Sequence, residues 1–346
     1  MLIIGCDYHP SFQQICWLDS ETGETQEREL GHASGEAERF YRQIGEPALI
    51  GIESTGNCDW FLEVLAGCGH ETWIGDALEI KACRARGQKH DRGDAQLILK
   101  LLLEKRFPKI WTPSSEEKDL RQLLIHRHKL VRMRVQAKNE LQHLAMNRGV
   151  ARSRRLWSRA GQQVLRDLAL RPWAARRRED LFKVKDLLDQ QIAVLDGAAL
   201  QAAEQNQQAR LLMTQPGVGP LTSLAFVLTM GDVSRFQRGK QVASYLGLIP
   251  REYSSGGKQR LGSISKQGNR FMRMLLVEAA QVAVRCDPQM RNEYLHRCHR
   301  KAKGVAKVAV ARKLAIRLYW MLRTNTGYPE VVRVESSSRV PLVSAS

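Results

Sequence analysis

Residues 89–103 have the sequence KHDRGDAQLILKLLL, and the rest of the chain can be understood outward from them. The leucine-rich part predicts a helix packed on a core. Asp91 and Asp94 lie three residues apart at its start, so both carboxylates leave one face of the first turn. Acids at a helix N-terminus also complement the helix dipole, and Asp91 could be a simple N-cap. Two acids further upstream favour a functional role.

Each upstream acid ends a short apolar run. Residues 2–7, LIIGCD, and residues 48–53, ALIGIE, predict buried strands that end at Asp7 and Glu53. Further strands are predicted over residues 12–18, 26–30 and 71–74, with a helix capped by Ser34 over residues 34–44. A three-strand meander followed by alternating strands and helices predicts an α/β domain of the RNase H-like type.

In a sheet of that type the first strand is central and a parallel strand lies beside it, so the four acids should converge. Carboxylates that close repel one another unless divalent cations neutralise them, and two Mg²⁺ ions roughly 3.5–4 Å apart are a common solution. Asp59 and Asp76 are weaker candidates, since one falls within a helix and the other follows an outer strand. The predicted metal ligands are Asp7, Glu53, Asp91 and Asp94.

The chain of 346 residues carries a net charge of +18 and has a pI of about 9.9. This surplus predicts a polyanionic partner, most simply nucleic acid, because no basic amphipathic anchor for a membrane surface is evident. No apolar run is long enough to span a membrane, and no basic leader precedes the first apolar residues. Seven scattered cysteines without CxxC pairs indicate a reducing compartment, so we expect a cytoplasmic protein.

Leucines recur every seven residues over residues 116–147 and again over 178–206. Two such helices predict an antiparallel hairpin or an intermolecular coiled coil, serving as a spacer or for dimerisation. The segment between them is rich in arginine, with Trp157 and Trp173 interleaved. Arginine in place of lysine favours phosphate binding and base stacking over a merely solvated surface. The candidate contacts here are Arg152, Arg154, Arg155, Arg176 and Arg177.

Two glycine-containing segments mark the C-terminal third. Residues 216–219, PGVG, precede a helix, and the amides of Gly217 and Gly219 could approach a phosphate as in a helix-hairpin-helix, or form a plain helix entry. Residues 251–262, REYSSGGKQRLG, predict an exposed loop, either merely flexible or holding a nucleophilic serine among cations. No histidine lies nearby in sequence, so a hydrolase triad is not supported. The cations in and after this loop are Arg251, Lys258, Arg260, Lys266 and Arg270.

These motifs together resemble those of the Piv/MooV-type DEDD transposases of bacterial insertion sequences, recombinases guided by a bridge RNA. The resemblance covers nearly the whole chain in the family's order. It differs from the usual pattern at Cys6, His9 and His90, none of which removes a metal ligand. The motifs are GCDYH at 5–9, ESTG at 53–56, KHDRGDA at 89–95, PGVG at 216–219, YLGLIP at 245–250, YSSG at 253–256 and SKQGNR at 265–270.

The resemblance implies a RuvC-like domain (1–108), a helical coiled-coil region with an arginine-rich insert (114–208), a transposase domain (209–328) and a disordered tail (329–346). The four acids would bind Mg²⁺. Ser255 would attack DNA to form a phosphoserine link, with the adjacent Ser254 as the alternative. The implied partners are donor and target DNA, a bridge RNA, and further copies of the chain in homodimers or homotetramers.

Three functions therefore compete. The first is a DNA recombinase that uses Ser255 and Mg²⁺. The second is a Mg²⁺-dependent nuclease or junction resolvase that uses the acids alone, and the third is a non-catalytic nucleic-acid scaffold. The C-terminal third favours the first, because a plain nuclease would not need the serine segment.

Overall fold

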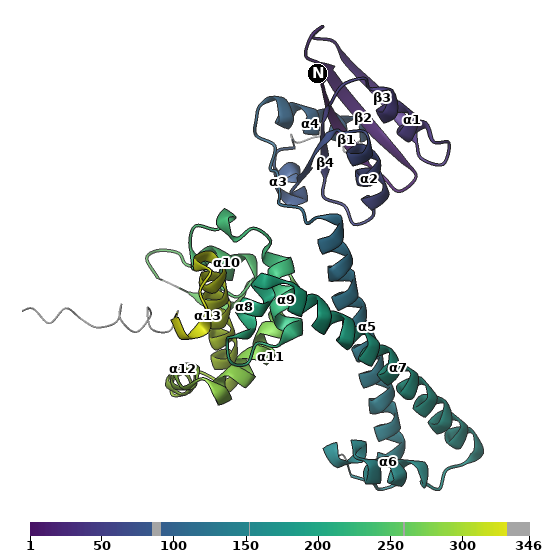
Figure 1. The fold of residues 1–346 in the computed structure, drawn as a ribbon, viewed down its shortest axis with the longest axis vertical. Helices are drawn as coiled ribbons and strands as arrows, with labels where there is room; N and C mark the ends of the chain where they lie inside the picture. The colour runs from purple at the N-terminus through teal and green to yellow at the C-terminus, as the bar shows by residue number, and fades with distance from the viewer. Residues whose placement is uncertain (85–90, 152, 259, 331–346) are drawn as a thin grey trace, which may run out of the picture. The chain divides into compact units, whose positions relative to one another are not determined.

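The structure, a computed structural model, describes residues 1–84, 91–151, 153–258 and 260–330. It divides into two compact units, Met1–Thr112 and Pro113–Ser346 (Figure 1). Within the described ranges, no helix combines the length and the hydropathy that a membrane span requires. Predictions for residues 87–90, Arg152 and the tail from residue 331 fall outside the described residues.

A five-stranded sheet forms the centre of the first unit, in the order β3-β2-β1-β4-β5. β1, β2 and β3 form an antiparallel meander, β4 pairs parallel to β1, and β5 pairs parallel to β4. This mixed sheet agrees with the RNase H-like arrangement predicted from the sequence. The strands are β1 (Leu2–Tyr8), β2 (Phe12–Asp19), β3 (Thr25–Gly31), β4 (Leu49–Glu53) and β5 (Glu71–Gly75).

Helices cover both faces of the sheet (Figure 1). One face packs against Tyr41 of α1 and against Phe61 and Leu65 of α2, whereas the other packs against Ile98 and Leu102 of α4. The helices of this unit are α1 (Glu36–Gln43), α2 (Asp59–Gly67), α3 (Ala77–Ala82) and α4 (Asp91–Leu103).

The predicted Ser34 cap of α1 is wrong. The N-cap residue is Gly35, in the left-handed conformation with φ 68°, and it makes no side-chain cap bond. The Ser34 hydroxyl instead donates to the Gly31 carbonyl oxygen at 3.3 Å, within the turn that precedes the helix.

Two glycines let α4 lie directly on the backbone of the central strands. A Cβ atom on Gly5 would lie 2.3 Å from the carbonyl oxygen of Ala95 and 2.5 Å from the amide nitrogen of Leu99. A Cβ on Gly51 of β4 would lie 2.8 Å from a methyl carbon of Leu102. Because neither strand has a side chain at the contact, the backbone of α4 lies against β1 at Gly5, and the α4 side chains Ile98 and Leu102 fill the space over Gly51.

The second unit begins with two long helices, α5 (Ser115–Met146) and α7 (Pro172–Gln205). The two helices are antiparallel, because ion-pair partners with higher residue numbers on α5 have lower residue numbers on α7. α7 begins six residues earlier than predicted, with Pro172 in its first turn, where proline is tolerated. A supercoil between the helices stays a prediction. The ion pairs are Arg127–Asp196 (2.7 Å), Arg134–Asp189 (2.9 Å) and Arg177–Glu140 (2.8 Å).

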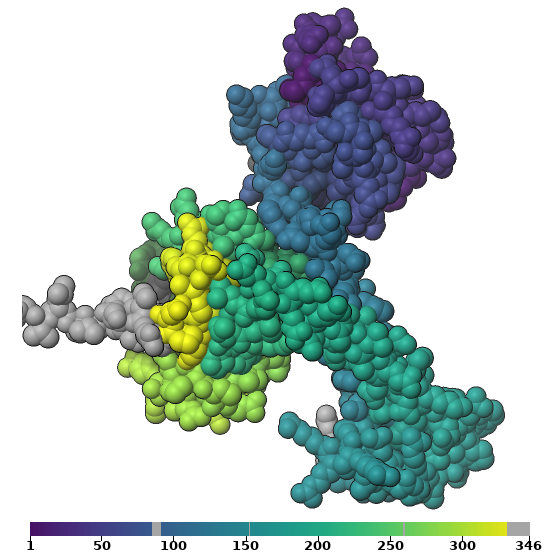
Figure 2. Space-filling view, viewed as in Figure 1, coloured from purple at the N-terminus to yellow at the C-terminus, as the bar shows by residue number. Residues whose placement is uncertain are grey.

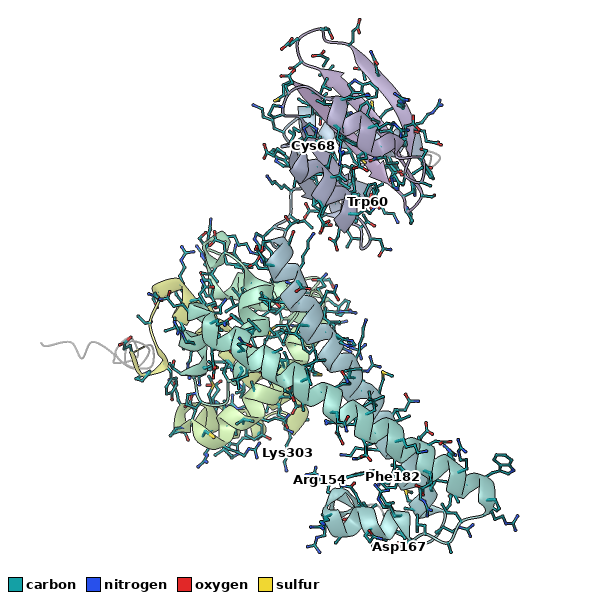
Figure 3. All side chains as sticks on the ribbon, turned by 45° about the vertical axis from the view of Figure 1, so that its right-hand side comes forward. Trp60, Cys68, Arg154, Asp167, Phe182 and Lys303 are labelled. Atoms are coloured by element: carbon teal, nitrogen blue, oxygen red, sulfur yellow. The ribbon has the colours of Figure 1, made fainter. Side chains whose placement is uncertain are left out.

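A small separate core closes the far end of this hairpin. Here η1 (Arg154–Trp157) and α6 (Arg159–Arg166) pack onto the long helices. Figure 2 shows this end as a distinct teal knob, and Figure 3 labels Arg154, Asp167 and Phe182 there. We refer to residues 147–171 with the adjoining ends of α5 and α7 as the hairpin tip. Its buried residues are Leu141, Ala145, Leu156, Leu165 and Phe182.

The remaining elements pack around α9, of which every residue from Thr222 to Met230 is buried. α12 was not predicted from the sequence, because its polar residues show no clear apolar stripe and only Met290 is buried. The predicted division of this unit near residue 208 stays a prediction. The elements are α8 (Gln207–Met213), α9 (Pro220–Met230), η2 (Val233–Arg235), α10 (Gly239–Tyr245), β6 (Pro250–Glu252), β7 (Leu261–Ile264), α11 (Arg270–Cys286), α12 (Pro288–Cys298) and α13 (Lys303–Thr324).

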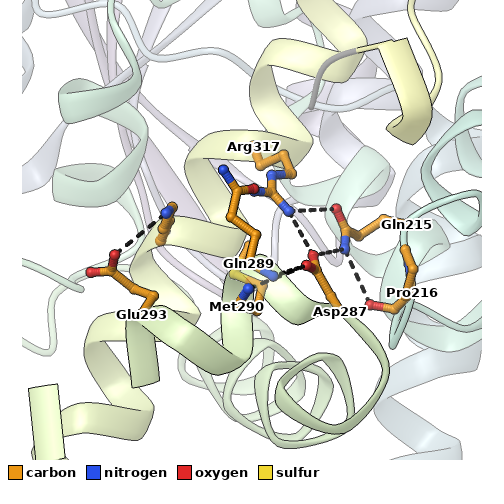
Figure 4. A network of polar contacts seen from close by, with 8 residues as sticks. Gln215, Pro216, Asp287, Gln289, Met290, Glu293 and Arg317 are labelled. Carbon is orange, nitrogen blue, oxygen red and sulfur yellow. Dashed lines mark hydrogen bonds and ion pairs between the residues drawn. The ribbon is translucent and has the colours of Figure 1, made fainter. Parts of the chain in front are cut away.

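A fully buried ion pair joins α13, α12 and the PGVG turn (Figure 4). Arg317 donates to the Asp287 carboxylate at 2.8 Å, and neither side chain is exposed. The Gln215 amide donates to Asp287 at 3.4 Å and to the Pro216 carbonyl oxygen at 3.2 Å. Asp287 also caps α12 by accepting the Gln289 amide at 2.9 Å. One carboxylate therefore holds two helices and the turn together.

We expect Gly5→Ala to destabilise the first unit by about 1–3 kcal/mol, because the added methyl group must displace the backbone of α4. Hydrogen-exchange mass spectrometry of the full chain should show faster exchange in peptides from β1 and α4. Gly45→Ala is the control, since a Cβ there meets no atom within 4 Å. Equal exchange in the two variants would contradict the close packing.

We expect Asp287→Asn to destabilise the second unit by about 3–5 kcal/mol. Asparagine keeps the cap on α12 but removes the carboxylate charge that lies 2.8 Å from the buried Arg317 guanidinium. Asp232→Asn is the matched control, because Asp232 caps η2 at the surface. Pulse proteolysis in urea measures both, and a similar unfolding midpoint for the two would show that the buried charge pair contributes little.

Candidate functional site

The predicted acids lie on the α4 face of the sheet. The β1–β4 register pairs Gly5 with Gly51 and Cys6 with Ile52, so Asp7 and Glu53 are the next residues on adjacent strands. Side chains alternate between faces along a strand, so these two acids share the face of the glycines on which α4 packs. Asp91 lies in the first described turn of α4, at this end of the sheet.

Three side chains gather closely here. His9 Nε2 lies 3.2 Å from Asp7 Oδ2 and 3.6 Å from Asp91 Oδ2, and one ligand atom from each of the three residues lies within 4.8 Å of the others. The imidazole stacks on Phe12 with ring centroids 4.7 Å apart. Sequence reasoning noted His9 only as a departure from the family pattern; its place two residues after Asp7, before the β1–β2 turn, was the available signal.

Asp94 has a different partner from Asp7 and Asp91. Asp94 is buried and forms an ion pair with Arg84 at 2.5 Å, a contact that the sequence did not predict. Burial raises the pKa of Asp7 above its ordinary value, and the charges of Asp94 and Asp91 raise it further, whereas His9 lowers it. Burial and the neighbouring carboxylates thus disfavour the ionised form of Asp7, and a bound cation would oppose this effect.

The spacing of Asp7, His9 and Asp91 suits a cation. Atoms about 2.1 Å from an octahedral ion lie about 3.0 Å apart at neighbouring positions and about 4.2 Å apart at opposite ones. Among the described residues, this is the one group of three or more His, Cys, Asp or Glu side chains with compatible ligand atoms. The weaker candidate Asp76 instead caps α3 by accepting the Leu78 and Glu79 amides.

The predicted serine loop is a β-hairpin rather than an irregular loop. β6 and β7 pair Glu252 with Leu261, the Tyr253 amide donates to the Arg260 carbonyl oxygen, and Ser255 pairs with Lys258. Gly256 and Gly257 turn the chain with φ of 56° and 73°. Positive φ at both central residues is the hairpin turn that glycine permits, so the Gly-Gly pair could have predicted it.

The register separates the two serines. Residues directly opposite and residues two apart share a face, so Tyr253, Ser255, Lys258 and Arg260 lie on one face of the hairpin. Ser254 points the other way: its hydroxyl donates to Glu252 at 2.6 Å and accepts the Arg260 amide at 3.1 Å. Within the part of the chain that the structure describes, the exposed Ser255 hydroxyl makes no hydrogen bond.

The glycines of the PGVG turn have different environments. Gly217, with φ 90°, faces α11, and a Cβ there would lie 2.5 Å from the amide nitrogen of Ala283. Packing therefore accounts for this glycine. Gly219 is exposed at the start of α9, and a Cβ there would meet no atom within 4 Å. A phosphate contact at this turn stays a prediction.

The other predicted cations are exposed, but not all are free. Arg154 and Arg155 lie on η1 without a described acidic partner, whereas Arg176 pairs with Asp180 at 2.9 Å and Arg177 with Glu140 at 2.8 Å. In the second half Arg251 donates to the Ser265 carbonyl oxygen at 3.3 Å. Three further predicted cations are exposed without a described acidic partner, namely Arg260, Lys266 and Arg270.

Comparison with known proteins places the N-terminal and the C-terminal parts of the chain in one family. The family profile DEDD_Tnp_IS110, described as a transposase, matches residues 4–146, and that of the Transposase IS116/IS110/IS902 family matches residues 209–295. Over 336 residues the chain is 30% identical to a Pseudomonas aeruginosa protein described as a "probable family 20 transposase", covering 94% of this chain and 98% of that protein. The chain belongs to the IS110 family of insertion-sequence transposases.

Other relatives agree with this assignment. The transposase is 27% identical to the transposase for insertion sequence element IS1111A of Coxiella burnetii, over 82% of this chain and 78% of that one. It is 33% identical over 125 residues to the pilin gene-inverting protein of Moraxella bovis, covering 35% and 39% of the two chains. This protein is thus an enzyme that acts on DNA, and its DEDD domain suggests a divalent metal at the acidic cluster.

We expect His9→Ala to weaken Mn²⁺ binding to the transposase by about 10-fold or more, because the imidazole lies within ligand distance of Asp7 and Asp91. Isothermal titration calorimetry measures the affinity, and His126→Ala, on the exposed surface of α5, is the control. If His9→Ala binds Mn²⁺ as tightly as the control does, His9 neither ligates the metal nor orients its ligands.

Proposed function

We propose that this transposase cuts and rejoins DNA through a covalent phosphoserine intermediate at Ser255, with Mg²⁺ held by Asp7, Glu53, Asp91 and Asp94. The observation that carries the proposal is the hairpin face on which the exposed Ser255 lies opposite Lys258. A nucleophile for a phosphodiester needs an accessible hydroxyl and cations that neutralise the phosphate under attack. Lys258 and Arg260 supply such charges on the same face.

Ser255 is the better nucleophile of the serine pair. The Ser254 hydroxyl is engaged in two hydrogen bonds that hold the hairpin, so its attack would break them. The Ser255 side chain is exposed beside the Gly-Gly turn, where a DNA backbone can approach it.

The reaction conserves the number of phosphoester bonds. The Ser255 oxygen forms a bond to phosphorus and loses its proton, while a DNA oxygen leaves that phosphorus and takes up a proton. The reverse attack by a DNA hydroxyl on the phosphoserine rejoins strands without ATP. Mg²⁺, when bound, would polarise the phosphodiester and stabilise the departing oxygen.

The acidic cluster fits such an ion. Carboxylate oxygens are the ligands that Mg²⁺ prefers. The pKa of Asp7 is raised mainly by burial and further by the charges of Asp94 and Asp91, which a cation would neutralise. Arg84 provides part of that compensation at Asp94, and the His9 imidazole lies 3.2 Å from the Asp7 carboxylate. Glu53 and Asp7 directly follow Ile52 and Cys6, the last pair of the β1–β4 register, so they are neighbours across the two strands.

The proposal includes a bridge RNA and assembly into homodimers or homotetramers on donor and target DNA. These parts rest on the family resemblance. The hairpin tip supports an RNA contact, since Arg154, Arg155 and Arg159 are exposed there and Trp173 is 86% exposed. The basic charge of +18 suits several nucleic-acid strands at once.

We expect Ser255→Ala to abolish the covalent protein–DNA adduct while leaving DNA affinity unchanged within about two-fold, because the serine is exposed and its hydroxyl makes no hydrogen bond to any described residue. Denaturing gel electrophoresis with end-labelled DNA and Mg²⁺ detects the adduct. Ser254→Ala is the matched control and should still form it, more slowly, because the hairpin loses two bonds. An adduct that persists in Ser255→Ala, or free 5′-phosphate products indifferent to this change, would favour a metal-dependent nuclease.

A further inference from the structure

We propose that the hollow between the serine hairpin and helices α12 and α13 binds an unpaired DNA strand leading away from the phosphate that Ser255 attacks. The inference deepens the proposed function and rests on it. The hollow has a volume of about 1020 Å³ and lies wholly within the second unit. β7 of the hairpin forms one wall, and α12 and α13 form the other.

The side chains that line the hollow carry an excess of positive charge, which favours an anionic ligand. Glu293 accepts both Arg297 at 2.5 Å and Lys313 at 3.5 Å, so it serves two cations. Lys301 and Arg312 also line the hollow and have no side-chain partner among the residues that the structure describes. Four cations against one acid leave a surplus of three positive charges. Because Arg312 is half-buried, water compensates its charge less well than at an open surface.

The apolar part of the lining indicates exposed bases rather than phosphate alone. Val305 and Leu261 line the hollow and are 53% and 56% exposed, with Val308 and Ile316 beside them. A duplex hides its bases, whereas an unpaired strand offers both bases and phosphates to one groove. A groove with an apolar floor and cationic walls therefore matches a single strand.

Continuity with Ser255 indicates DNA as the occupant. Leu261 on the wall pairs with Glu252, three residues before Ser255, which corresponds to about 10 Å along the strand. Leu261 lies on the face of the hairpin opposite Ser255, so a strand leading away from the phosphate would reach the hollow around the edge of the hairpin. Tyr253 lies between them on the Ser255 face, 63% exposed, and its ring covers Gly262, where a Cβ would lie 3.2 Å from the Cε2 atom. An exposed ring seated on a glycine is a suitable stacking platform beside the nucleophile.

The test compares two double variants of the full chain that remove equal charge. The groove variant, Lys301→Ala with Arg312→Ala, removes the two lining cations that have no described side-chain partner. The control variant, Lys129→Ala with Arg132→Ala, removes one lysine and one arginine from the exposed surface of α5. Fluorescence anisotropy with labelled 15-nucleotide oligothymidine measures affinity from about 50 to 200 mM salt. Circular dichroism checks that each variant is folded.

We expect the groove variant to bind at least 10-fold more weakly, with a salt slope shallower by about 1.4, which is 0.7 for each of two lost phosphate contacts. The α5 variant should change less than about two-fold. Equal losses in both variants would mean that net charge alone acts, and no loss in the groove variant would also overturn the proposal. If the groove variant loses affinity only for a matched oligouridine RNA and keeps its affinity for the DNA, the proposal is also overturned, in favour of an RNA site.

A second pair of variants tests the stacking step without touching buried residues. Tyr253→Phe should keep the affinity for the oligonucleotide, and Tyr253→Leu should lower it about 5-fold or more. Ser255→Ala should bind normally in the same assay. If Ser255→Ala still forms the covalent adduct, the proposed function fails, whereas the binding results judge the groove independently.

Discussion

The contact between α4 and the bare backbone of Gly5 and Gly51 is the constraint on which the first unit depends. It allows the helix to lie against the two central strands, and so fixes the first turn of α4 above the point where both strands end. Asp7, Glu53, Asp91 and Asp94 follow from that placement. Two unit charges 4 Å apart repel by about 4 kcal/mol at an effective dielectric constant near 20. The fold tolerates this crowding because the leucine-rich face of α4 packs on the sheet, Arg84 supplies opposite charge to Asp94, and His9 hydrogen-bonds Asp7.

The serine hairpin, unlike the acidic site, does not depend on close packing. It has little buried surface, and its shape comes from backbone pairing, the Gly-Gly turn and the two bonds of Ser254. Behind it, the core around α9 and the buried Arg317–Asp287 pair give the unit a rigid frame. An exposed hydroxyl on a defined hairpin, carried by a firmly packed body, gives a reactive group that DNA can reach without losing its alignment.

The apolar runs of the sequence were sufficient to predict the strand order of the first unit, because buried strands and a leucine-rich helix leave periodic signals. The same is true of α5, which begins with a capping box between Ser114 and Glu117. Contacts between distant residues left no such signal, as with Arg84 on Asp94. For Gly217 the sequence left open a phosphate contact and a plain helix entry; the close packing against α11 was not foreseen, and the phosphate contact stays a prediction. The hairpin was predicted as a loop because a short, polar pair of strands has no apolar alternation.

The central claim is that the ends of β1 and β4 and the start of α4 hold one metal site. Fe²⁺ substituted for Mg²⁺ generates hydroxyl radicals that cut the backbone near the bound ion, and mass spectrometry of the full-length transposase locates the cuts. The account predicts cuts close to Asp7, Glu53 and Asp91 together, all lost in Asp7→Asn. Cuts at only one of these segments, or a pattern unchanged by Asp7→Asn, would contradict it.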